Sequence, residues 1–227
     1  MTTCAVLLPG SGLGSWIWGQ VAPDLDQVIA IDYPAEAKTR WELTDYAHHV
    51  VTQIEAAEVE NVVLIGHSIG TVVALEAAAL LGDRVAGLLS IAGAVPPTGG
   101  SFFSAFPFPQ RTIVSTVVRL LGTRPPNGTL RRGLCAGLDE AMTADVIARF
   151  APESQHLFRD APQSATTVFV RGYIQTALDK EIPPVLQERF AERLDVGFRA
   201  AVETGHLPML EAPSELAATI GEFLGRV

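Results

Sequence analysis

The sequence has little cysteine, and this excludes two kinds of small protein. Among 227 residues only Cys4 and Cys135 are cysteines. Two cysteines are too few for a disulfide scaffold, and no histidine cluster at ligand spacing accompanies them to form a zinc site. We therefore expect two reduced thiols, a cytoplasmic protein, and no metal or cofactor.

Basic residues are also scarce. Lysine and arginine number 16 against 25 acidic residues, so the net charge is −9. An acidic chain without a basic cluster argues against nucleic acid or an anionic membrane as a partner. No basic residue precedes the short apolar run at 5–8, so we expect no secretory leader. The apolar stretch 62–81 has the length of a membrane span, but Gly66, His67 and Ser68 divide it into a strand and a helix.

Hydrophobic residues, by contrast, are abundant. They make up 48% of the chain and charged residues only 18%, which excludes intrinsic disorder. A chain of this length buries roughly 70% of its unfolded surface when it folds. We expect one domain over residues 1–227.

Six apolar runs, each closed by glycine or proline, predict strands. They are continuous in Val, Ile and Leu rather than alternating, which is typical of strands buried on both faces of a parallel sheet. Helical patterns lie between them at 43–58, 68–81 and 213–224. This alternation predicts an α/β fold with a doubly wound, mostly parallel six-stranded sheet flanked by helices. The predicted strands cover residues 4–8, 27–31, 61–65, 86–91, 167–174 and 196–202.

The alternation breaks between about 94 and 162, where pairs of proline and glycine recur. Helices are predicted at 110–121, 129–135 and 139–150, as a helical cap inserted before the penultimate strand. The core is then formed by 1–93 and 163–227. A phenylalanine cluster at the start of the cap either packs the cap onto the core or forms the wall of an apolar pocket. Its members are Phe102, Phe103, Phe106 and Phe108.

Residues 66–70 read Gly-His-Ser-Ile-Gly, a G-x-S-x-G pattern between a predicted strand and a predicted helix. This is the setting of a nucleophile elbow, a tight turn that exposes the Ser68 hydroxyl at the edge of the sheet. Glycine at 66 and 70 lets strand and helix approach, and the helix N-terminus favours developing negative charge. A glycine-rich turn without chemistry is the alternative.

A serine nucleophile needs a base, and His206 is the best candidate. It follows the last predicted strand, so it lies at the same sheet edge as Ser68. His67 is adjacent to Ser68 and points elsewhere on the turn. The other histidines are interpreted as structural or surface residues: His48 and His49 in a helix, and His156 in the cap.

The base in turn needs a carboxylate to orient it. Asp179 follows the penultimate strand, and the order Ser68, Asp179, His206 is that of α/β-hydrolases. Glu181 is interpreted as a solvated neighbour, and Asp195 precedes the last strand, at the wrong edge.

Two backbone N–H groups are needed to hold a developing oxyanion. One is expected from Ile69, and the other from the glycine-rich loop at 9–14. That loop lacks the Lys-Ser/Thr of a phosphate-binding loop, so nucleotide binding is not expected.

Together these residues resemble the α/β-hydrolase superfamily, and more narrowly its small methylesterase and hydroxynitrile-lyase-like branch. The resemblance rests on 6–18, 66–70, 173–179, 182–184 and 205–213, and it covers the body of the protein, about two-thirds of the chain. It implies a triad of Ser68, His206 and Asp179, with the N–H groups of Ser11 and Ile69 as the oxyanion hole. Residues expected to line the substrate pocket are Gly10, Trp16, Phe102, Phe103, Phe106 and Leu207.

The sequence departs from this branch at three places. Pro9-Gly10 replaces the usual His-Gly, and 32–36 replaces a glycine-containing loop. Leu207 stands where the lyases carry lysine, which favours ester hydrolysis. The expected function is thus a serine hydrolase acting on a small, largely apolar carboxylic ester. A lyase or cyclase, a thioesterase, and a binding protein without turnover are the alternatives.

Overall fold

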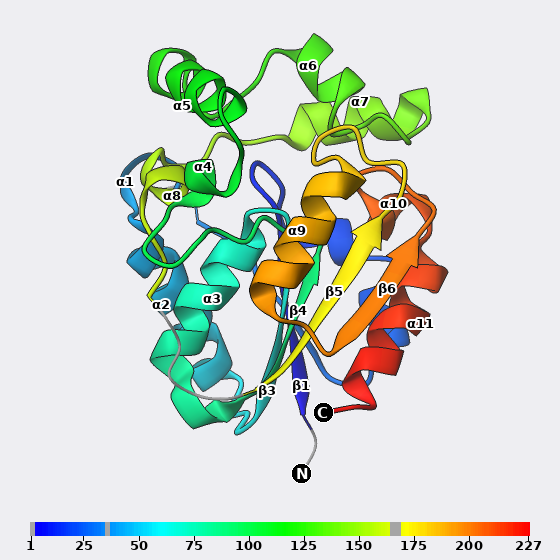
Figure 1. Ribbon diagram of the computed structural model, residues 1–227. Coiled ribbons are helices and arrows are strands. Elements are labelled where there is room, and N and C mark those ends of the chain that lie inside the picture. Colours follow the sequence, from blue (N-terminus) through cyan, green and yellow to red (C-terminus); the bar gives the residue numbers. More distant parts are fainter. Residues whose placement is uncertain (1–2, 35–36, 164–168) are drawn as a thin grey trace.

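The computed structural model describes residues 3–34, 37–163 and 169–227, and within these ranges six parallel strands form one sheet. The strand order is β2-β1-β3-β4-β5-β6 (Figure 1). All six predicted runs form strands, with ends that differ by a few residues. The predicted strand start at 167–168 and part of the 32–36 loop lie outside the described residues. The strands are β1 (Cys4–Leu8), β2 (Val28–Ala30), β3 (Val62–His67), β4 (Val85–Ile91), β5 (Val170–Thr176) and β6 (Phe198–Val202).

Helices cover both faces of the sheet, which explains why β1 and β3 are apolar and buried along their whole length. One face packs against α2, α3 and α9, and the other against α11 and two 3-10 turns (Figure 1). Each face encloses its own hydrophobic core. These elements are α2 (Leu43–Ala56), α3 (Gly70–Leu81), α9 (Pro184–Leu194), α11 (Pro213–Leu224), η1 (Ser15–Trp18) and η2 (Ala22–Asp24).

The predicted helix 213–224 has the observed limits, whereas the helix predicted from 68 begins at Gly70. Ser68 and Ile69 form the turn before it. The prediction omitted α9, although Leu186, Phe190 and Leu194 recur every four residues on its buried side. None of the helices in the described ranges is long and apolar enough to cross a membrane.

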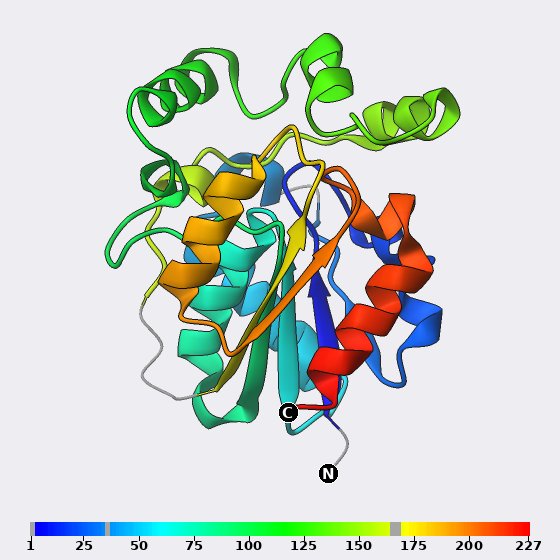
Figure 2. The same cartoon turned by 45° about the vertical axis from the view of Figure 1, so that its right-hand side comes forward.

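A helical cap lies between β4 and β5, as predicted. Figures 1 and 2 show α5, α6 and α7 beyond the carboxyl ends of the strands, so the cap covers the edge where Ser68 lies. The predicted helix 110–121 has the observed limits, and that at 139–150 is shorter because Asp139 caps it, accepting from the Met142 N–H at 2.7 Å. The predicted helix 129–135 is displaced. The cap contains α4 (Phe102–Ala105), α5 (Gln110–Leu121), α6 (Asn127–Arg132), α7 (Glu140–Arg149) and α8 (His156–Arg159).

Candidate active site

Ser68 occupies a strained turn between β3 and α3. Its φ is +54°, a left-handed conformation that costs a non-glycine residue about 1–3 kcal/mol. A Cβ at Gly66 would lie 2.6 Å from the backbone N of Thr71, and one at Gly70 would lie 2.6 Å from the Pro9 carbonyl oxygen. Both glycines are therefore required for this turn, which directs Ser68 into a cavity beneath the cap.

Asp179 lies in the loop after β5, and its buried carboxylate is surrounded by donors. Oδ1 accepts from the N–H groups of Glu181 and Ile182 at 2.8 and 2.9 Å. Oδ2 accepts from the Thr176 hydroxyl at 2.8 Å. Burial by itself would raise the pKa of Asp179, but the charge and hydrogen bond of His206, together with these donors, lower it below its usual value. Asp179 is therefore ionised at neutral pH.

Gln187 of α9 also holds this carboxylate, and the sequence analysis missed it. Its Nε2 donates to Asp179 Oδ2 at 3.0 Å and to the Ile182 carbonyl at 2.7 Å. Its Oε1 accepts from the Thr176 N–H at 3.0 Å. Gln187 thus ties α9 to the end of β5 and orients the acid loop. The only signal in the sequence is a polar residue beside the apolar stripe of a helix that was not predicted.

His206 follows β6 and is fully buried against Asp179. Its Nδ1 lies 2.7 Å from Asp179 Oδ2. Because that oxygen belongs to an ionised carboxylate, Nδ1 carries the hydrogen and Nε2 is left to accept a proton. Burial lowers the pKa of His206, but the charge and hydrogen bond of Asp179, with smaller contributions from Glu181 and Glu211, raise it above its usual value.

Two further side chains brace the His206 loop. His67 Nε2 donates to the His206 carbonyl oxygen at 2.8 Å, and burial, with the nearby His206, lowers the pKa of His67 to about 3. His67 is therefore neutral and holds the backbone of the candidate base. Glu211 accepts from the Gly205 N–H at 2.7 Å. His48, His49 and His156 are not among the residues that line the cavity.

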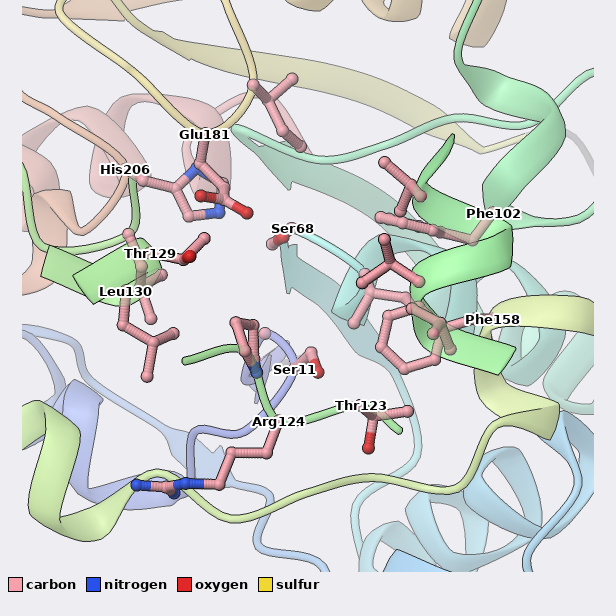
Figure 3. A pocket seen from close by; sticks show the side chains of 18 of the residues that line it. Ser11, Ser68, Phe102, Thr123, Arg124, Thr129, Leu130, Phe158, Glu181 and His206 are labelled. Carbon is pink, nitrogen blue, oxygen red and sulfur yellow. The ribbon is translucent and has the colours of Figure 1, made fainter. Parts of the chain in front are cut away.

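The cavity has a volume of about 430 Å³ and a mostly apolar lining. Ser68 and His206 lie on the same side of it, and side chains of the cap face them (Figure 3). Phe102 and Phe106 line the cavity as predicted, as does Gly10. Helix α5 adds an apolar face to the wall, through Ile113, Val114, Val117, Val118 and Leu121.

Three residues predicted to line the pocket lie outside its lining. Trp16 packs beneath the Arg149 guanidinium, 4.9 Å from the ring centroid, at a contact between core and cap. Phe103 is buried and stacks on Phe158 at 5.9 Å, because it points from α4 toward the core. Leu207 is fully buried in the core beside α11. The phenylalanine cluster therefore serves both expected purposes, while Phe108 is 73% exposed.

The candidate oxyanion donors face the same cavity. Ser11 and Ile69 both line it, and in the described part of the chain neither backbone N–H has a backbone acceptor. The glycine-rich loop is fixed from the cap: the Ala151 N–H donates to the Gly12 carbonyl at 3.0 Å. The Phe150 ring occupies the space where a Cβ of Gly12 would be.

Glu181 is an exposed neighbour of Asp179, as expected, and its side chain also lines the cavity. Its place in the cavity wall, next to His206 (Figure 3), was not predicted from the sequence. The Glu181 N–H is bound to Asp179, so the loop returns over the cavity and carries the side chain with it.

Both cysteines are buried and free. Within the described ranges, no group of three or more His, Cys, Asp or Glu side chains is arranged to hold a metal ion.

The sequence matches the model of a known protein family. The family model described as "Alpha/beta hydrolase family" matches residues 5–219. The chain belongs to the alpha/beta hydrolase family. Its six-stranded parallel sheet with a helical insertion after β4 is the fold of this family. A comparison with curated proteins finds no match.

Solved structures of other alpha/beta hydrolases share this fold. An extracellular alpha/beta-hydrolase from a Paenibacillus species has a TM-score of 0.87 at 18% identity, over 97% of this chain and 98% of that one. That hydrolase is described as sharing structural and functional homology with tobacco Salicylic Acid Binding Protein 2. Polyneuridine aldehyde esterase has a TM-score of 0.78 at 20% identity, over 98% and 99% of the two chains. The methylesterase MES16 from Arabidopsis has a TM-score of 0.80 at 16% identity, over 100% of both. At these identities the likeness shows the fold alone.

Proposed function

We propose that this alpha/beta hydrolase is a serine esterase that cleaves small, largely apolar carboxylic esters. The observation that carries the proposal is the 2.7 Å bond between His206 Nδ1 and Asp179 Oδ2, made at the rim of the cavity into which the strained Ser68 turn opens. An oriented base beside a serine on a strand–turn–helix elbow is the arrangement that activates a hydroxyl for acyl transfer.

The first half of the reaction transfers the acyl group to Ser68. The hydroxyl oxygen attacks the ester carbonyl carbon while His206 Nε2 takes the hydroxyl proton, and Asp179 stabilises the imidazolium. The N–H groups of Ser11 and Ile69 donate to the oxyanion, each contributing about 3–4 kcal/mol of transition-state stabilisation. The carbon–oxygen bond to the alcohol then breaks, and the alcohol leaves with the proton from His206.

The second half returns the enzyme to its starting state. Water attacks the acyl-Ser68 carbonyl, with His206 Nε2 accepting a proton from the water. The carboxylic acid leaves, and the proton passes from His206 back to the Ser68 oxygen. No redox step or cofactor is needed for this cycle.

The wall of the cavity supports the choice of substrate. Its apolar surface from Phe102, Phe106 and α5 stabilises a hydrocarbon group by about 0.8 kcal/mol for each buried CH₂. Leu207 follows His206 and is buried, so that position supplies no cation to stabilise a cyanide leaving group. The esterases among the structures with the same fold give independent support.

The proposal is tested with p-nitrophenyl esters of increasing acyl length, from acetyl to octanoyl. We expect Ser68→Ala to lower kcat by about 10³-fold or more, because the nucleophile is lost. Ser214→Ala, at an exposed position of α11, is the matched control. A fluorophosphonate should phosphonylate the wild type and Ser214→Ala with loss of fluoride, and so increase their mass, but it should leave the mass of Ser68→Ala unchanged. Retention of full esterase activity by Ser68→Ala would show that the assignment is wrong.

A further inference from the structure

The carboxylate of Glu181 is a feature of the cavity that the esterase mechanism does not use. Figure 3 shows it next to His206, and Ser68 lies on the same side of the cavity. Its backbone position is fixed, because the Glu181 N–H donates to Asp179 Oδ1 at 2.8 Å. Any substrate whose carbonyl reaches Ser68 therefore lies close to this carboxylate.

Within the described residues, the Glu181 side chain makes neither a hydrogen bond nor an ion pair. Apart from the histidines, Arg124 is the one basic side chain among the described residues that line the cavity. Its guanidinium donates to the carbonyl oxygens of Ile147 and Phe150 and lies 5.5 Å from the centroid of the Phe150 ring. Figure 3 shows its side chain directed away from Ser68 and His206. No lysine or arginine among the described cavity-lining residues therefore pairs with Glu181, and the nearby His206 is hydrogen-bonded to Asp179.

The cap leaves room for the Glu181 carboxylate. A Cβ at Gly133, between α6 and α7, would lie only 2.1 Å from Glu181 Oε2. Glu181 is exposed as a residue, but protein atoms of the cap lie close to its carboxylate. Desolvation of the carboxylate by these surroundings raises the pKa of Glu181; the nearby His206 opposes the change, and the charge of Asp179 adds to it. A carboxylate in such surroundings is stabilised by a positive charge brought by a ligand.

We propose that Glu181 binds a cationic group of the substrate, so that the preferred esters carry an ammonium group a few bonds from the scissile carbonyl and an apolar remainder. This inference rests on the proposed esterase function and specifies its substrate class. The ammonium group pairs with Glu181 beside His206, and the hydrocarbon part lies against Phe102, Phe106 and α5. The net charge of −9 attracts such a substrate to the protein.

The test uses two esters of nearly the same shape. Butyrylcholine carries a quaternary nitrogen where 3,3-dimethylbutyl butyrate carries a carbon atom, so only the charge differs. We expect the wild type to favour butyrylcholine in kcat/KM by about tenfold or more. Glu181→Gln should bring the ratio close to one, and Glu181→Asp should restore part of the preference. Glu192→Gln, an exposed position of α9, makes the same change in net charge and should keep the wild-type ratio.

Two results would overturn the cation site. One is a ratio near one in the wild type. The other is an equal loss on both esters in Glu181→Gln, which would mean that Glu181 acts through His206 instead. Circular dichroism and thermal unfolding of each variant establish that it folds.

A binding measurement separates this inference from the esterase proposal. By calorimetry, the wild type should bind choline more tightly than 3,3-dimethylbutanol, and Glu181→Gln should bind the two equally. If neither ester is hydrolysed but this difference in binding is found, the esterase proposal fails and the cation site stands. If choline binds no better than the alcohol, the cation site is wrong, whatever the rate on the neutral ester.

Discussion

Asp179 and His206 each shift the pKa of the other away from its ordinary value. The carboxylate accepts five hydrogen bonds, and one of these comes from His206. Its pKa is lowered although burial works in the opposite direction, while that of His206 is raised. For the mechanism this means that the base is protonated over a wider pH range than a free histidine.

The pH dependence of the reaction follows from this shift. His206 accepts a proton only when it is neutral, so kcat/KM should rise with pH and reach its half-maximum above about pH 6.5. Asp179→Asn removes the charge that raises the pKa of His206, so the half-maximum should move to lower pH and kcat should fall by about 10⁴-fold. Stopped-flow rates across the pH range measure both effects. Asp195→Asn, at the exposed C-cap of α9, is the control, and an unshifted profile in Asp179→Asn would contradict the assigned pairing.

At the scale of elements, the turn between β3 and α3 has no room for added atoms. Gly70 begins α3, and a Cβ there would lie 2.6 and 2.7 Å from the carbonyl oxygens of Pro9 and Leu8. Those atoms belong to the backbone at the end of β1 and cannot move without disturbing the sheet. The elbow and the oxyanion loop are therefore positioned by one close contact between two elements.

We accordingly expect Gly70→Ala to lower the free energy of unfolding by about 1–3 kcal/mol, and to reduce esterase activity as the loop shifts. Gly221→Ala is the matched control, since no atom lies within 4 Å of a Cβ there and the position is inside α11. That variant should raise the free energy of unfolding by about 0.5–1 kcal/mol. Urea unfolding measures both variants. Equal effects of the same sign would show that the close contact at Gly70 is unimportant.

At the scale of the whole molecule, the buried pair of Asp179 and His206 makes the free energy of unfolding decrease toward both low and high pH. The pKa of Asp179 is lower in the folded than in the unfolded protein, so this residue stabilises the fold at pH values above its unfolded pKa, about 4. That stability is lost as the pH falls through the pKa of the folded state. The pKa of His206 is higher in the folded than in the unfolded protein, so this residue stabilises the fold below about pH 6.5. That stability is lost as the pH rises through the pKa of the folded state. The pair is therefore most stabilising between these two limits.

His206→Ala should consequently cost more stability at about pH 5.5 than at about pH 8.5, because the ion pair is present at the lower pH and only a neutral hydrogen bond at the higher. Urea unfolding at the two pH values gives the difference directly. His48→Ala removes an exposed histidine of α2 and should show no such difference. A cost for His206→Ala that is independent of pH would mean that the pair is not ionised in the folded protein.

Local patterns were enough to predict the architecture. The six apolar runs and the amphipathic helices predicted the parallel sheet and the cap, because hydrophobic periodicity reports directly which elements are buried and on how many faces. Residues that follow parallel strands meet at one edge of the sheet. The positions of Ser68, Asp179 and His206 in the chain therefore sufficed to expect them at a common site, and the glycines at 66 and 70 to expect a tight turn.

Only the tertiary structure decided which side chains reach that site. Gln187 holds Asp179 from a helix that was not predicted, and His67 binds the His206 carbonyl from across the sheet edge. Glu181 enters the cavity, whereas Trp16 turns away from it to lie under Arg149. These outcomes depend on rotamers and loop directions set by packing between segments distant in the chain. A sequence pattern specifies which face of an element is buried, but not which neighbour that face meets.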